Sequence, residues 1–485
     1  MKLLHIIEKI NFVNYKGDID IEIFNISSNS KKINHSGIFI AIEGLKFNGN
    51  DYIDEAIYNG AKVIITENDL SLNENITIIK VKCSRTAFAE ISKIFYNKNC
   101  NNLRFIGITG TNGKTTTSFM IKSILDLKNK KNGLIGTIQN EFANYILPSL
   151  RTTPEADELH QLLNRMERSG CENVIMEVSS HALTLKRVAG IKFDLGIFTN
   201  LSEEHLDFHS SMNNYFNQKK ILFNEMKNDK CPIIVNIDDC YGDKLYNEFK
   251  KQTLTYGLSN DAMYRASKIR IKNHKTIFKL DTPKNKNVKF MIPFIGTHNI
   301  YNALAAIVTL SQCGLKIKDI RKNFVKVKSI PGRLQLVSKN DKKQIYIDYA
   351  HTVDSLKIVL QTLKKISHRK LWLVFGCGGN RDTTKRKKMG KIASMYSDEI
   401  IITSDNPRDE NPLSICKEII SGCKNGDNIE IIVDRKKAIK SVLTKSNSKD
   451  IILIAGRGHE NYQEIKGEMI PFNDAKIIDE VINDQ

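Results

Sequence analysis

The chain has 485 residues, and its size and composition exclude several classes of protein. A chain this long exceeds a single hydrophobic core, so about three domains are expected. No apolar run approaches the ~20 residues that cross a bilayer, and Glu8 and Lys9 interrupt the apolar start, so we expect neither membrane insertion nor a signal peptide. The nine cysteines form no C-x-x-C pair, which favours reduced thiols in the cytoplasm.

The formal net charge is +19, which fits either a nucleic-acid binder or an enzyme for polyanionic small molecules. Lysines are spread along the whole chain, and clusters such as 268–275 and 385–388 stay short. The joint abundance of Lys, Asn and Ile is typical of a genomic composition bias. We therefore expect no nucleic-acid partner, and keep a nucleic-acid-stimulated ATPase as the alternative from another class.

In chain order, the pattern predicts an α/β protein with two doubly wound units behind a small α/β module. Short apolar runs at 37–42 and 61–66 mark the module, which we place at residues 1–86. A helix over 85–96 leads into a central domain, 87–331, whose buried strands at 174–178, 195–199 and 232–236 predict a mainly parallel sheet. A Pro-Gly turn at 330–333 predicts a hinge. Beyond it, strands at 344–349, 371–375, 399–403 and 451–455 and a helix over 355–365 predict a second doubly wound domain, 332–485.

A glycine-rich loop stands between an apolar run at 104–109 and a segment with helical spacing. Strand, glycine-rich turn and helix form a phosphate-binding loop, in which backbone N–H groups and the helix N-terminus face the anion. Lys114 is expected to reach the outer phosphates of ATP, and the Thr115 hydroxyl to bind Mg²⁺. The usual first glycine is replaced by Ile108, so the loop is a shortened variant. Its expected ATP contacts are Gly110, Thr111, Asn112, Gly113, Lys114, Thr115 and Thr116.

Polar residues follow two consecutive predicted strands. Glu177 ends one of them, and His205, with Asp207 and His209, follows the next. After a phosphate-binding loop, such groups at the carboxyl ends of strands favour a metal site. A histidine there is also a common structural hydrogen-bonding residue. His205 and His209 have the H-x-x-x-H spacing of a zinc site, but the segment lacks a third ligand and the Glu of H-E-x-x-H, so zinc is the less favoured metal.

Taken together, the motifs resemble the ATP-dependent Mur ligases, in the family's order and over nearly the whole chain. The segments that carry the resemblance are 110–116 (GTNGKTT), 177–181 (EVSSH), 200–209 (NLSEEHLDFH), 296–302 (GTHNIYN), 331–333 (PGR), 348–352 (DYAHT), 405–408 (DNPR) and 456–460 (GRGHE). The nearest branch adds the third residue of the peptidoglycan stem peptide. The missing upstream glycine is a trait of these ligases.

The resemblance implies an N-terminal domain for the UDP-sugar, a central ATPase domain and a C-terminal Rossmann-like domain for the incoming amino acid. For UDP-N-acetylmuramoyl-L-Ala-D-Glu it implies Ser30, Thr152, Thr153, Ser179 and Arg187. Asn29 and Lys31 replace the usual Asp and Arg beside Ser30. For ATP it adds Asn302, Asp348 and His351, the latter two expected in a polar turn after a strand. The catalytic residues that it implies are Lys114, His205, Lys219 and Arg333.

Lys219 aligns with the family's carbamylated lysine. Carbamylation turns the cation into an anionic oxygen ligand, which suits Mg²⁺, so the expected metal ligands are Thr115, Glu177, His205 and modified Lys219. Lys220 follows directly, and the choice of Lys219 rests on the count back from Leu222 and Phe223. Two solvated lysines on a helix remain the alternative.

The reaction implied by this resemblance is transfer of the ATP γ-phosphoryl group to the substrate's D-Glu carboxylate, followed by attack of an amine on the acyl phosphate. The sequence favours meso-diaminopimelate as the amine, because Arg408 suits its distal carboxylate and would repel the ammonium of lysine. The residues expected around it are Arg381, Asp405, Asn406, Pro407, Arg408, Gly456 and Glu460. Another Mur-type ligase, folylpolyglutamate synthetase or a non-catalytic homologue remain alternatives, and a monomer is expected.

Overall fold

The computed structural model describes residues 1–44, 47–71, 75–96, 102–128, 130–272, 274–338, 343–424 and 428–483. Contacts between Cα atoms divide it into two compact units: 1–109, 128–197 and 216–233 form the first, and 110–127, 198–215 and 234–485 the second. Within the described ranges, no helix is both long and apolar enough to span a bilayer. All eight cysteines in these ranges are free thiols.

The N-terminal part of the first unit is a five-stranded sheet in the order β1-β5-β4-β3-β2, parallel except for β1. Its elements are α1 (Leu3–Ile7), β1 (Asn14–Lys16), β2 (Asn25–Ser27), η1 (Ser30–Lys32), β3 (Gly37–Ile40), η2 (Gly49–Tyr52), α2 (Ile53–Tyr58), β4 (Ala61–Thr66), β5 (Thr77–Lys80) and α3 (Ser84–Tyr96). Ile38 and Ile40 pack with α1 and α3, whereas Phe39 packs with α2. This alternation of strand side chains buries both faces of the sheet and confirms the predicted α/β module.

The rest of the first unit is a second sheet, in which β11, β6, β10, β7, β8 and β9 lie in that order. Its elements are β6 (Arg104–Thr109), β7 (Asn132–Ile135), β8 (Gln139–Phe142), β9 (Tyr145–Pro148), α5 (Ala156–Arg168), β10 (Asn173–Glu177), α6 (Ser180–Thr184), β11 (Leu195–Phe198) and most of α8 (Met212–Asn224). Strands β6, β10 and β7 are parallel, and β7, β8 and β9 are antiparallel. In the register of β10, Glu177 lies beside Ile108, at the point where β6 leads into the glycine-rich loop.

The second unit starts with the helix that follows this loop. Its elements up to residue 331 are α4 (Lys114–Asp126), α7 (Leu206–His209), β12 (Ile233–Asn236), α9 (Cys240–Glu248), η3 (Lys250–Gln252), β13 (Thr253–Gly257), β14 (Tyr264–Lys272), β15 (Lys275–Asp281), β16 (Val288–Ile292), α10 (Thr297–Gln312) and α11 (Ile317–Phe324). The long helix α10 is buried over most of its length and packs against α4. Strands β14, β15 and β16 form an antiparallel meander that the prediction of a mainly parallel sheet did not include.

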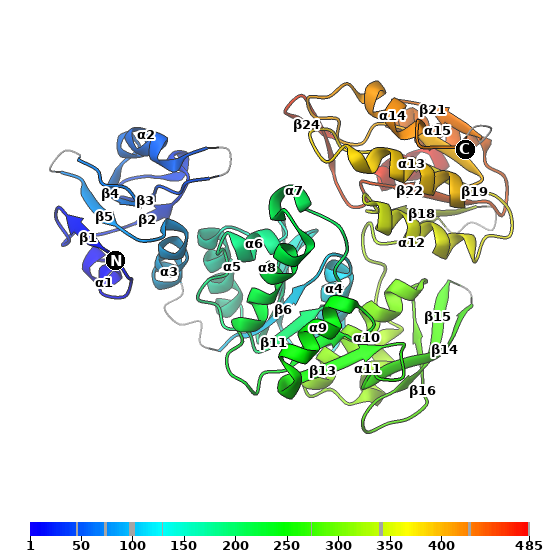
Figure 1. Ribbon diagram of the computed structural model, residues 1–485, viewed down its shortest axis with the longest axis horizontal. Coiled ribbons are helices and arrows are strands. Elements are labelled where there is room, and N and C mark those ends of the chain that lie inside the picture. Colours follow the sequence, from blue (N-terminus) through cyan, green and yellow to red (C-terminus); the bar gives the residue numbers. More distant parts are fainter. Residues whose placement is uncertain are drawn as a thin grey trace. The chain divides into compact units, whose positions relative to one another are not determined.

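The C-terminal part is a six-stranded sheet in the order β17-β18-β22-β19-β20-β21, parallel except for β17. Figure 1 labels β18, β19, β21 and β22 of this sheet. Its elements are β17 (Gln335–Ser338), β18 (Gln344–Asp348), α12 (Val353–Lys364), β19 (Leu371–Phe375), α13 (Thr384–Tyr396), β20 (Glu399–Ile402), α14 (Pro412–Ile420), β21 (Ile429–Ile431), α15 (Arg435–Lys445), β22 (Ile451–Ala455), the hairpin β23 (Tyr462–Ile465) and β24 (Glu468–Pro471), and α16 (Asp474–Asn483). This confirms a doubly wound C-terminal unit.

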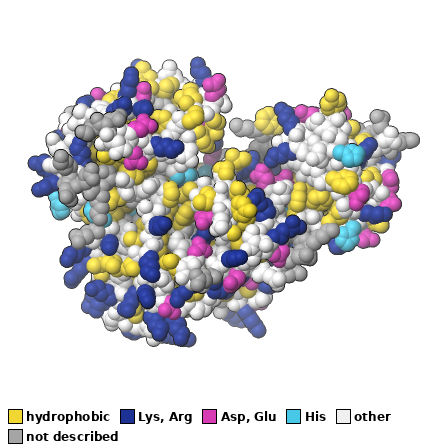
Figure 2. Space-filling model, turned by 180° about the vertical axis from the view of Figure 1, so that it is seen from behind, with side chains coloured by type: hydrophobic (Ala, Val, Ile, Leu, Met, Phe, Trp, Pro, Cys, Tyr) yellow, Lys and Arg dark blue, Asp and Glu magenta, His cyan; other side chains and the backbone are white. Residues whose placement is uncertain are grey.

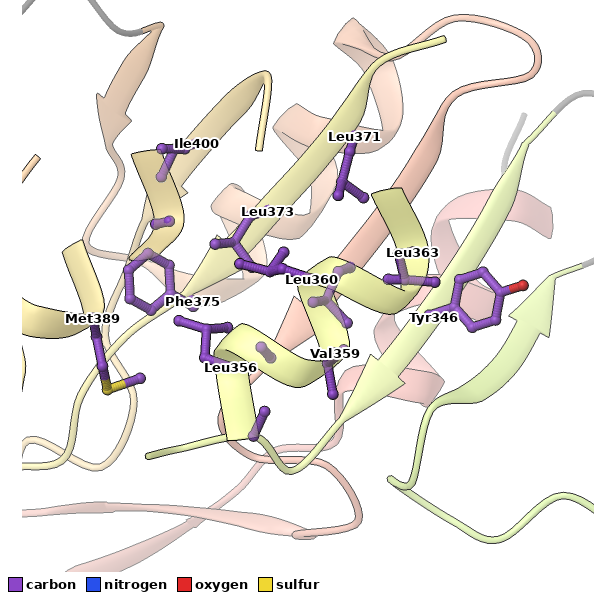
Figure 3. Packing of buried hydrophobic residues seen from close by; sticks show 14 of the residues in the cluster. Tyr346, Leu356, Val359, Leu360, Leu363, Leu371, Leu373, Phe375, Met389 and Ile400 are labelled. Atoms are coloured by element: carbon purple, nitrogen blue, oxygen red, sulfur yellow. The ribbon is translucent and has the colours of Figure 1, made fainter. Parts of the chain in front are cut away.

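The core of the C-terminal sheet lies on both of its faces. Figure 3 shows Leu371, Leu373 and Phe375 of β19 packed against the apolar side of α12, with Met389 of α13 beside them. The intervening Trp372 and Val374 pack on the other face with α15 and α16. Each buried aliphatic or aromatic side chain contributes about 1.5–3 kcal/mol to the stability of the fold. The helices packed on both faces of the sheet therefore hold the carboxyl ends of its strands, and the loops that follow them, in fixed positions.

Candidate active site

The glycine-rich loop has the conformation that its glycines allow. Gly110 (φ 140°) and Gly113 (φ 89°) adopt backbone angles that favour glycine, and a side chain on Gly110 would collide with Thr199. Ile108 lies inside β6 and is fully buried, which explains why the shortened loop has no glycine there. Lys114 starts α4, and its Nζ donates to the carbonyls of Gly110 and Thr111 at 2.8 Å each, so the cation already lies over the loop.

The segment that follows β11 braces this loop. Asn200 accepts a hydrogen bond from the Asn112 backbone N–H through Oδ1 (3.0 Å) and from the Thr111 N–H through its own carbonyl (2.8 Å). Thr199 Oγ1 donates to the Asn112 carbonyl at 2.7 Å. The sequence motif at 200–209 assigns no role to Asn200. In the structure its hydrogen bonds stabilise the conformation of the loop.

Two predicted ATP-site residues reach the loop from other elements. Asn302, in the second turn of α10, lies so close to Gly113 that a side chain on this glycine would collide with its amide oxygen. Arg333 donates from Nη2 to Thr115 Oγ1 at 3.2 Å, and its guanidinium lies 4.7 Å from the centre of the Tyr349 ring. The structure thus brings Arg333, Asn302 and the phosphate-binding loop together.

A carboxylate that sequence reasoning did not assign lies between the predicted histidines. Glu204 Oε1 is 3.4 Å from His351 Nε2 and 3.8 Å from His205 Nε2. Burial alone would raise the pKa of Glu204, but the hydrogen bond with His351 and the nearby charges of His205 and Lys114 hold the pKa well below its usual range. Glu204 is therefore ionised at neutral pH and orients His351, whose Nδ1 contacts the Tyr349 carbonyl at 2.8 Å.

Asp348 differs from the expectation of a residue in a polar turn. It is the last residue of β18 and is buried, and its two carboxylate oxygens accept hydrogen bonds from the backbone N–H groups of Leu334 (2.6 Å) and Ala350 (2.8 Å). Burial raises its pKa to about 6, against the opposing effects of Arg333 and these two hydrogen bonds. Asp348 thus ties the start of β17 to the end of β18, whereas His351 does lie in the following turn, as predicted.

In the first unit, the predicted peptide-binding residues gather around Glu177. Its carboxylate accepts hydrogen bonds from the Thr137 N–H (3.1 Å) and hydroxyl (2.9 Å), and the Thr137 hydroxyl is 3.1 Å from that of Thr152. Thr153 donates to the Glu177 carbonyl at 2.9 Å and accepts from the Ser179 N–H at 3.1 Å. Four predicted residues from two sequence segments, 151–154 and 177–181, are therefore connected, with Thr137 as an additional link.

Arg187 closes this group on another side. Its Nη2 is 2.7 Å from Glu155 Oε1, and its Nη1 donates to the Thr153 carbonyl at 3.2 Å. Burial lowers the pKa of Arg187, although Glu155 opposes this effect. The ion pair with Glu155 was not foreseen, because no sequence motif links the two residues.

The two candidate lysines of α8 differ in burial. Lys219 is 1% exposed, whereas Lys220 is only partly buried. The alternative of two solvated lysines is therefore wrong for Lys219. Of the two lysines, only Lys219 is enclosed by the protein, as a metal-binding side chain would be, and this difference supports its choice for the predicted modification.

Ser30 begins the short helix η1 and is buried, with its hydroxyl donating to Glu55 Oε2 at 2.5 Å. Asn29 caps this helix by accepting from the Lys31 N–H at 3.0 Å, and Lys32 forms an ion pair with Glu158 at 2.9 Å. Asn29 therefore has a local structural role as the cap of η1. The resemblance in sequence, which showed only that Asn29 stands in place of the family's Asp, did not predict this role.

In the C-terminal part, Arg408, the predicted carboxylate-binding residue, is held by two neighbouring groups. Its Nε donates to Glu464 Oε2 and its Nη1 to the Gly379 carbonyl, at 2.8 and 2.7 Å, and its backbone is left-handed (φ 52°). Pro407 precedes it. Arg381, by contrast, is exposed, and no contact in the described part of the chain joins it to Arg408.

The neighbours of Arg408 form a second connected group. Asn406 Nδ2 donates to Glu460 Oε2 at 3.0 Å, and Arg457 Nη1 donates to Asn406 Oδ1 at 2.7 Å. Gly456 (φ 107°) lies against the Asp405 carboxylate, so that a side chain there would crowd Asp405 Oδ2. Arg457 was read only as part of the motif at 456–460, and its burial is what sets it apart.

Comparison with known proteins places these groups in a family. Three family models match in chain order: "Mur ligase family, catalytic domain" over 22–96, "Mur ligase middle domain" over 108–310 and "Mur ligase, glutamate ligase domain" over 332–458. UDP-N-acetylmuramoyl-L-alanyl-D-glutamate–2,6-diaminopimelate ligase 1 of Clostridium acetobutylicum is 41% identical over the full length of both chains, and the corresponding ligase of Clostridium tetani is equally similar. The chain belongs to the Mur ligase family.

Solved structures agree with this assignment. One, described as UDP-N-acetylmuramoyl-L-alanyl-D-glutamate–2,6-diaminopimelate ligase, is 30% identical, has a TM-score of 0.70 and covers 100% of this Mur ligase and 99% of its own chain. A MurF ligase from Thermotoga maritima in complex with ADP (18% identity, TM-score 0.64) covers 95% of this chain and 97% of its own, and shares the fold. The three-domain α/β architecture expected from the sequence is thereby confirmed.

The residues of this Mur ligase fit a magnesium ion by their chemistry. In the second unit Thr115 offers a hydroxyl at the phosphate-binding loop, and in the first unit Glu177 offers a carboxylate; each is an oxygen ligand of the kind that Mg²⁺ favours. Among the described residues, no group of three or more His, Cys, Asp or Glu side chains is arranged as a metal cage. Mg²⁺ does not require one, because it commonly keeps waters and binds substrate phosphates with one or two protein carboxylates.

Proposed function

We propose that this Mur ligase joins meso-diaminopimelate to UDP-N-acetylmuramoyl-L-Ala-D-Glu at the expense of ATP. One observation carries the proposal: Arg408 and the Asn406–Glu460 pair lie together at the carboxyl ends of the C-terminal strands, in a chain similar from end to end to ligases named for 2,6-diaminopimelate. Arg408 supplies a guanidinium for the distal carboxylate, and Glu460 supplies an anion for an ammonium group.

For the nucleotide, we propose that the loop 110–116 holds the phosphates and that Lys114 lies against the outer ones. Asn302, Asp348 and His351 complete the nucleoside side, with Asp348 acting mainly by fixing the turn that carries His351. Lys114 and Arg333 add positive charge where the γ-phosphoryl group meets the substrate carboxylate, because two anions must approach there. Bound Mg²⁺ would neutralise phosphate charge, with Thr115, Glu177, His205 and carbamylated Lys219 as its proposed ligands.

For the UDP-sugar peptide, we propose Ser30 in the N-terminal domain and Thr152, Thr153, Ser179 and Arg187 in the central one. Thr153, Ser179 and Arg187 are joined by hydrogen bonds, and Thr152 is linked to Glu177 through Thr137, which supports a single peptide-binding surface. We propose the domains 1–86, 87–331 and 332–485 for the UDP-sugar, ATP and the amino acid, which the three family matches support. Arg381, Asp405, Pro407 and Gly456 complete the proposed amino-acid site.

We further propose that the enzyme acts as a monomer in the cytoplasm, where its nucleotide substrates are made, and that nucleic acid is no partner. Lysine and arginine side chains occur over the whole face seen in Figure 2, most densely at its lower left, with acidic and uncharged side chains among them. A nucleic-acid-stimulated ATPase would instead need these charges gathered along a groove or stripe.

The test is phosphate release from ATP with UDP-N-acetylmuramoyl-L-Ala-D-Glu and a panel of second substrates: meso-diaminopimelate, L-lysine, D-alanyl-D-alanine and L-glutamate. We expect release only when the UDP-sugar dipeptide and diaminopimelate are both present. Release with lysine or glutamate in place of diaminopimelate would contradict the assigned substrate. Stimulation by DNA or RNA without either substrate would favour the ATPase alternative.

A further inference from the structure

Arg457 is a buried arginine in the loop that follows β22, and the roles proposed above leave it unexplained. Its exposed fraction is 1%. Strand β19 lies between β22 and β20 in the sheet. The loop that follows β22, at 456–460, and the loop that follows β20, at 403–408, therefore meet over the end of β19. Arg457 crosses from one loop to the other.

The contacts of Arg457 form a closed triangle with two residues of the proposed amino-acid site. Its Nη1 donates to Asn406 Oδ1 at 2.7 Å and lies 3.4 Å from Glu460 Oε2. The triangle is completed by the hydrogen bond from Asn406 Nδ2 to the same Glu460 oxygen, at 3.0 Å. Without Arg457, the Asn406 amide and the Glu460 carboxylate would keep only the hydrogen bond between them out of the three contacts of the triangle.

The triangle fixes which way the Asn406 amide faces. Its oxygen accepts from both Arg457 and the Glu464 backbone N–H, the latter at 2.9 Å. With two donors on the oxygen, the amide nitrogen must face Glu460. A reversed amide would place its nitrogen against a guanidinium and its oxygen against a carboxylate, which is unfavourable on both sides.

Arg457 also acts on the charge of Glu460. Burial and the neighbouring Asp405 raise the pKa of Glu460, whereas Arg457, the hydrogen bond from Asn406 and His351 lower it. The other ionisable groups that interact with this carboxylate are Tyr349, Tyr462 and Arg435. Loss of Arg457 would remove the largest lowering influence on the pKa of Glu460, so this pKa would rise further.

Outside the triangle, the fold stabilises the Arg457 guanidinium only in part: its central carbon lies 5.5 Å from the centre of the Phe472 ring. Arg457 Nε and Nη2 are buried and have no hydrogen-bond partner among the described residues. Burying such donors costs about 1–3 kcal/mol each. Arg435, which serves the fold, is better paired: it makes two 2.8 Å bonds with Asp474 and one of 3.0 Å with the Ala455 carbonyl, and only its Nη1 lacks a partner among the described residues.

We propose that Arg457 is a positioning residue that fixes the Asn406 amide and holds the Glu460 carboxylate in place to receive an ammonium group of the amino-acid substrate. It lies behind these two side chains and acts through them. The inference rests on the proposed function, because it assigns Glu460 to the ammonium group of a diamino acid.

The experiment compares Arg457→Met and Arg457→Lys with the wild-type enzyme in steady-state phosphate release. Arg369→Met is the matched control, since it removes an exposed guanidinium from the same domain at the same cost in net charge. For Arg457→Met we expect KM for diaminopimelate to rise about tenfold or more while KM for ATP changes less than about twofold. The acid limb of kcat/KM for diaminopimelate should move to higher pH.

Arg457→Lys should keep the acid limb near its wild-type position, because it retains the cation, and should raise KM less than Arg457→Met does. A purely structural role predicts another result: lower kcat and a lower unfolding temperature, with KM and the pH profile unchanged, and this would overturn the inference. If Arg457→Met does not fold, the lysine variant decides on the same two readouts. A wild-type enzyme that releases no phosphate with diaminopimelate would overturn the proposed function itself, and the inference with it.

Discussion

Replacement of Arg408 by alanine is the sharpest test of the proposed substrate. The guanidinium has five N–H donors, and its bonds to Glu464 and the Gly379 carbonyl use one on Nε and one on Nη1. The edge formed by Nη1 and Nη2 thus retains donors for a substrate carboxylate. Loss of a hydrogen bond between charged groups costs about 1.5–3 kcal/mol, which corresponds to a fall of about 10- to 150-fold in kcat/KM for diaminopimelate.

The backbone of Arg408 supplies a control within the same position. Its φ of 52° is left-handed, a conformation that costs an alanine about 1–2 kcal/mol and a glycine almost nothing. Arg408→Gly should therefore unfold at a higher temperature than Arg408→Ala, while both lose the guanidinium and show the same fall in kcat/KM. If kcat/KM differed between the two variants in the same order as their unfolding temperatures, the loss of activity would be due to backbone geometry and not to the missing guanidinium.

The assay is coupled phosphate release with diaminopimelate varied at saturating ATP and UDP-sugar dipeptide, repeated with L-lysine. Because Arg408 repels the lysine ammonium, its removal should lower kcat/KM for diaminopimelate and raise kcat/KM for L-lysine, so that the ratio of the two falls. A kcat/KM for diaminopimelate within about twofold of wild type would refute the role of Arg408 in recognition.

Four further outcomes are expected. Lys219→Ala should abolish phosphate release while Lys219→Glu, which restores an anionic oxygen, retains part of it; a carbamate signal in ¹³C NMR with labelled bicarbonate should appear only in the wild type. Glu204→Gln should lower stability at neutral pH, because the pKa of Glu204 is held below its usual range; the difference in unfolding temperature from wild type should shrink as the pH falls below about 4. Asp348 has a pKa raised to about 6, so it favours the folded state below pH 4 and loses that contribution, about 3 kcal/mol, as the pH rises through 6; Asp348→Asn should remove this part of the pH dependence of urea unfolding. Asp474→Asn breaks a fully buried ion pair with Arg435 and should cost about 3–5 kcal/mol in the free energy of unfolding, and an unchanged urea midpoint would contradict this.

Much of the fold could be predicted because its strands are apolar on both faces. The runs at 371–375 and 451–455 coincide with β19 and β22, and those at 344–349 and 399–403 end one residue beyond β18 and β20. Such runs are continuous, and the turns that follow them are rich in glycine, proline and polar residues. The meander β14–β16 was missed, since its strands are half exposed and alternate polar and apolar residues, which weakens the signal of a sheet buried on both faces.

The sequence by itself determined the family, the order of the motifs and the phosphate-binding loop, because a glycine-rich turn between a strand and a helix is a local feature of the chain. Only the tertiary structure separated buried Lys219 from Lys220, placed Glu204 between His205 and His351, and put Arg457 beneath Asn406 and Glu460. Each of these depends on contacts between segments far apart in the chain. Burial and charge pairing arise from packing, so a linear pattern names the residue types but leaves their partners undetermined.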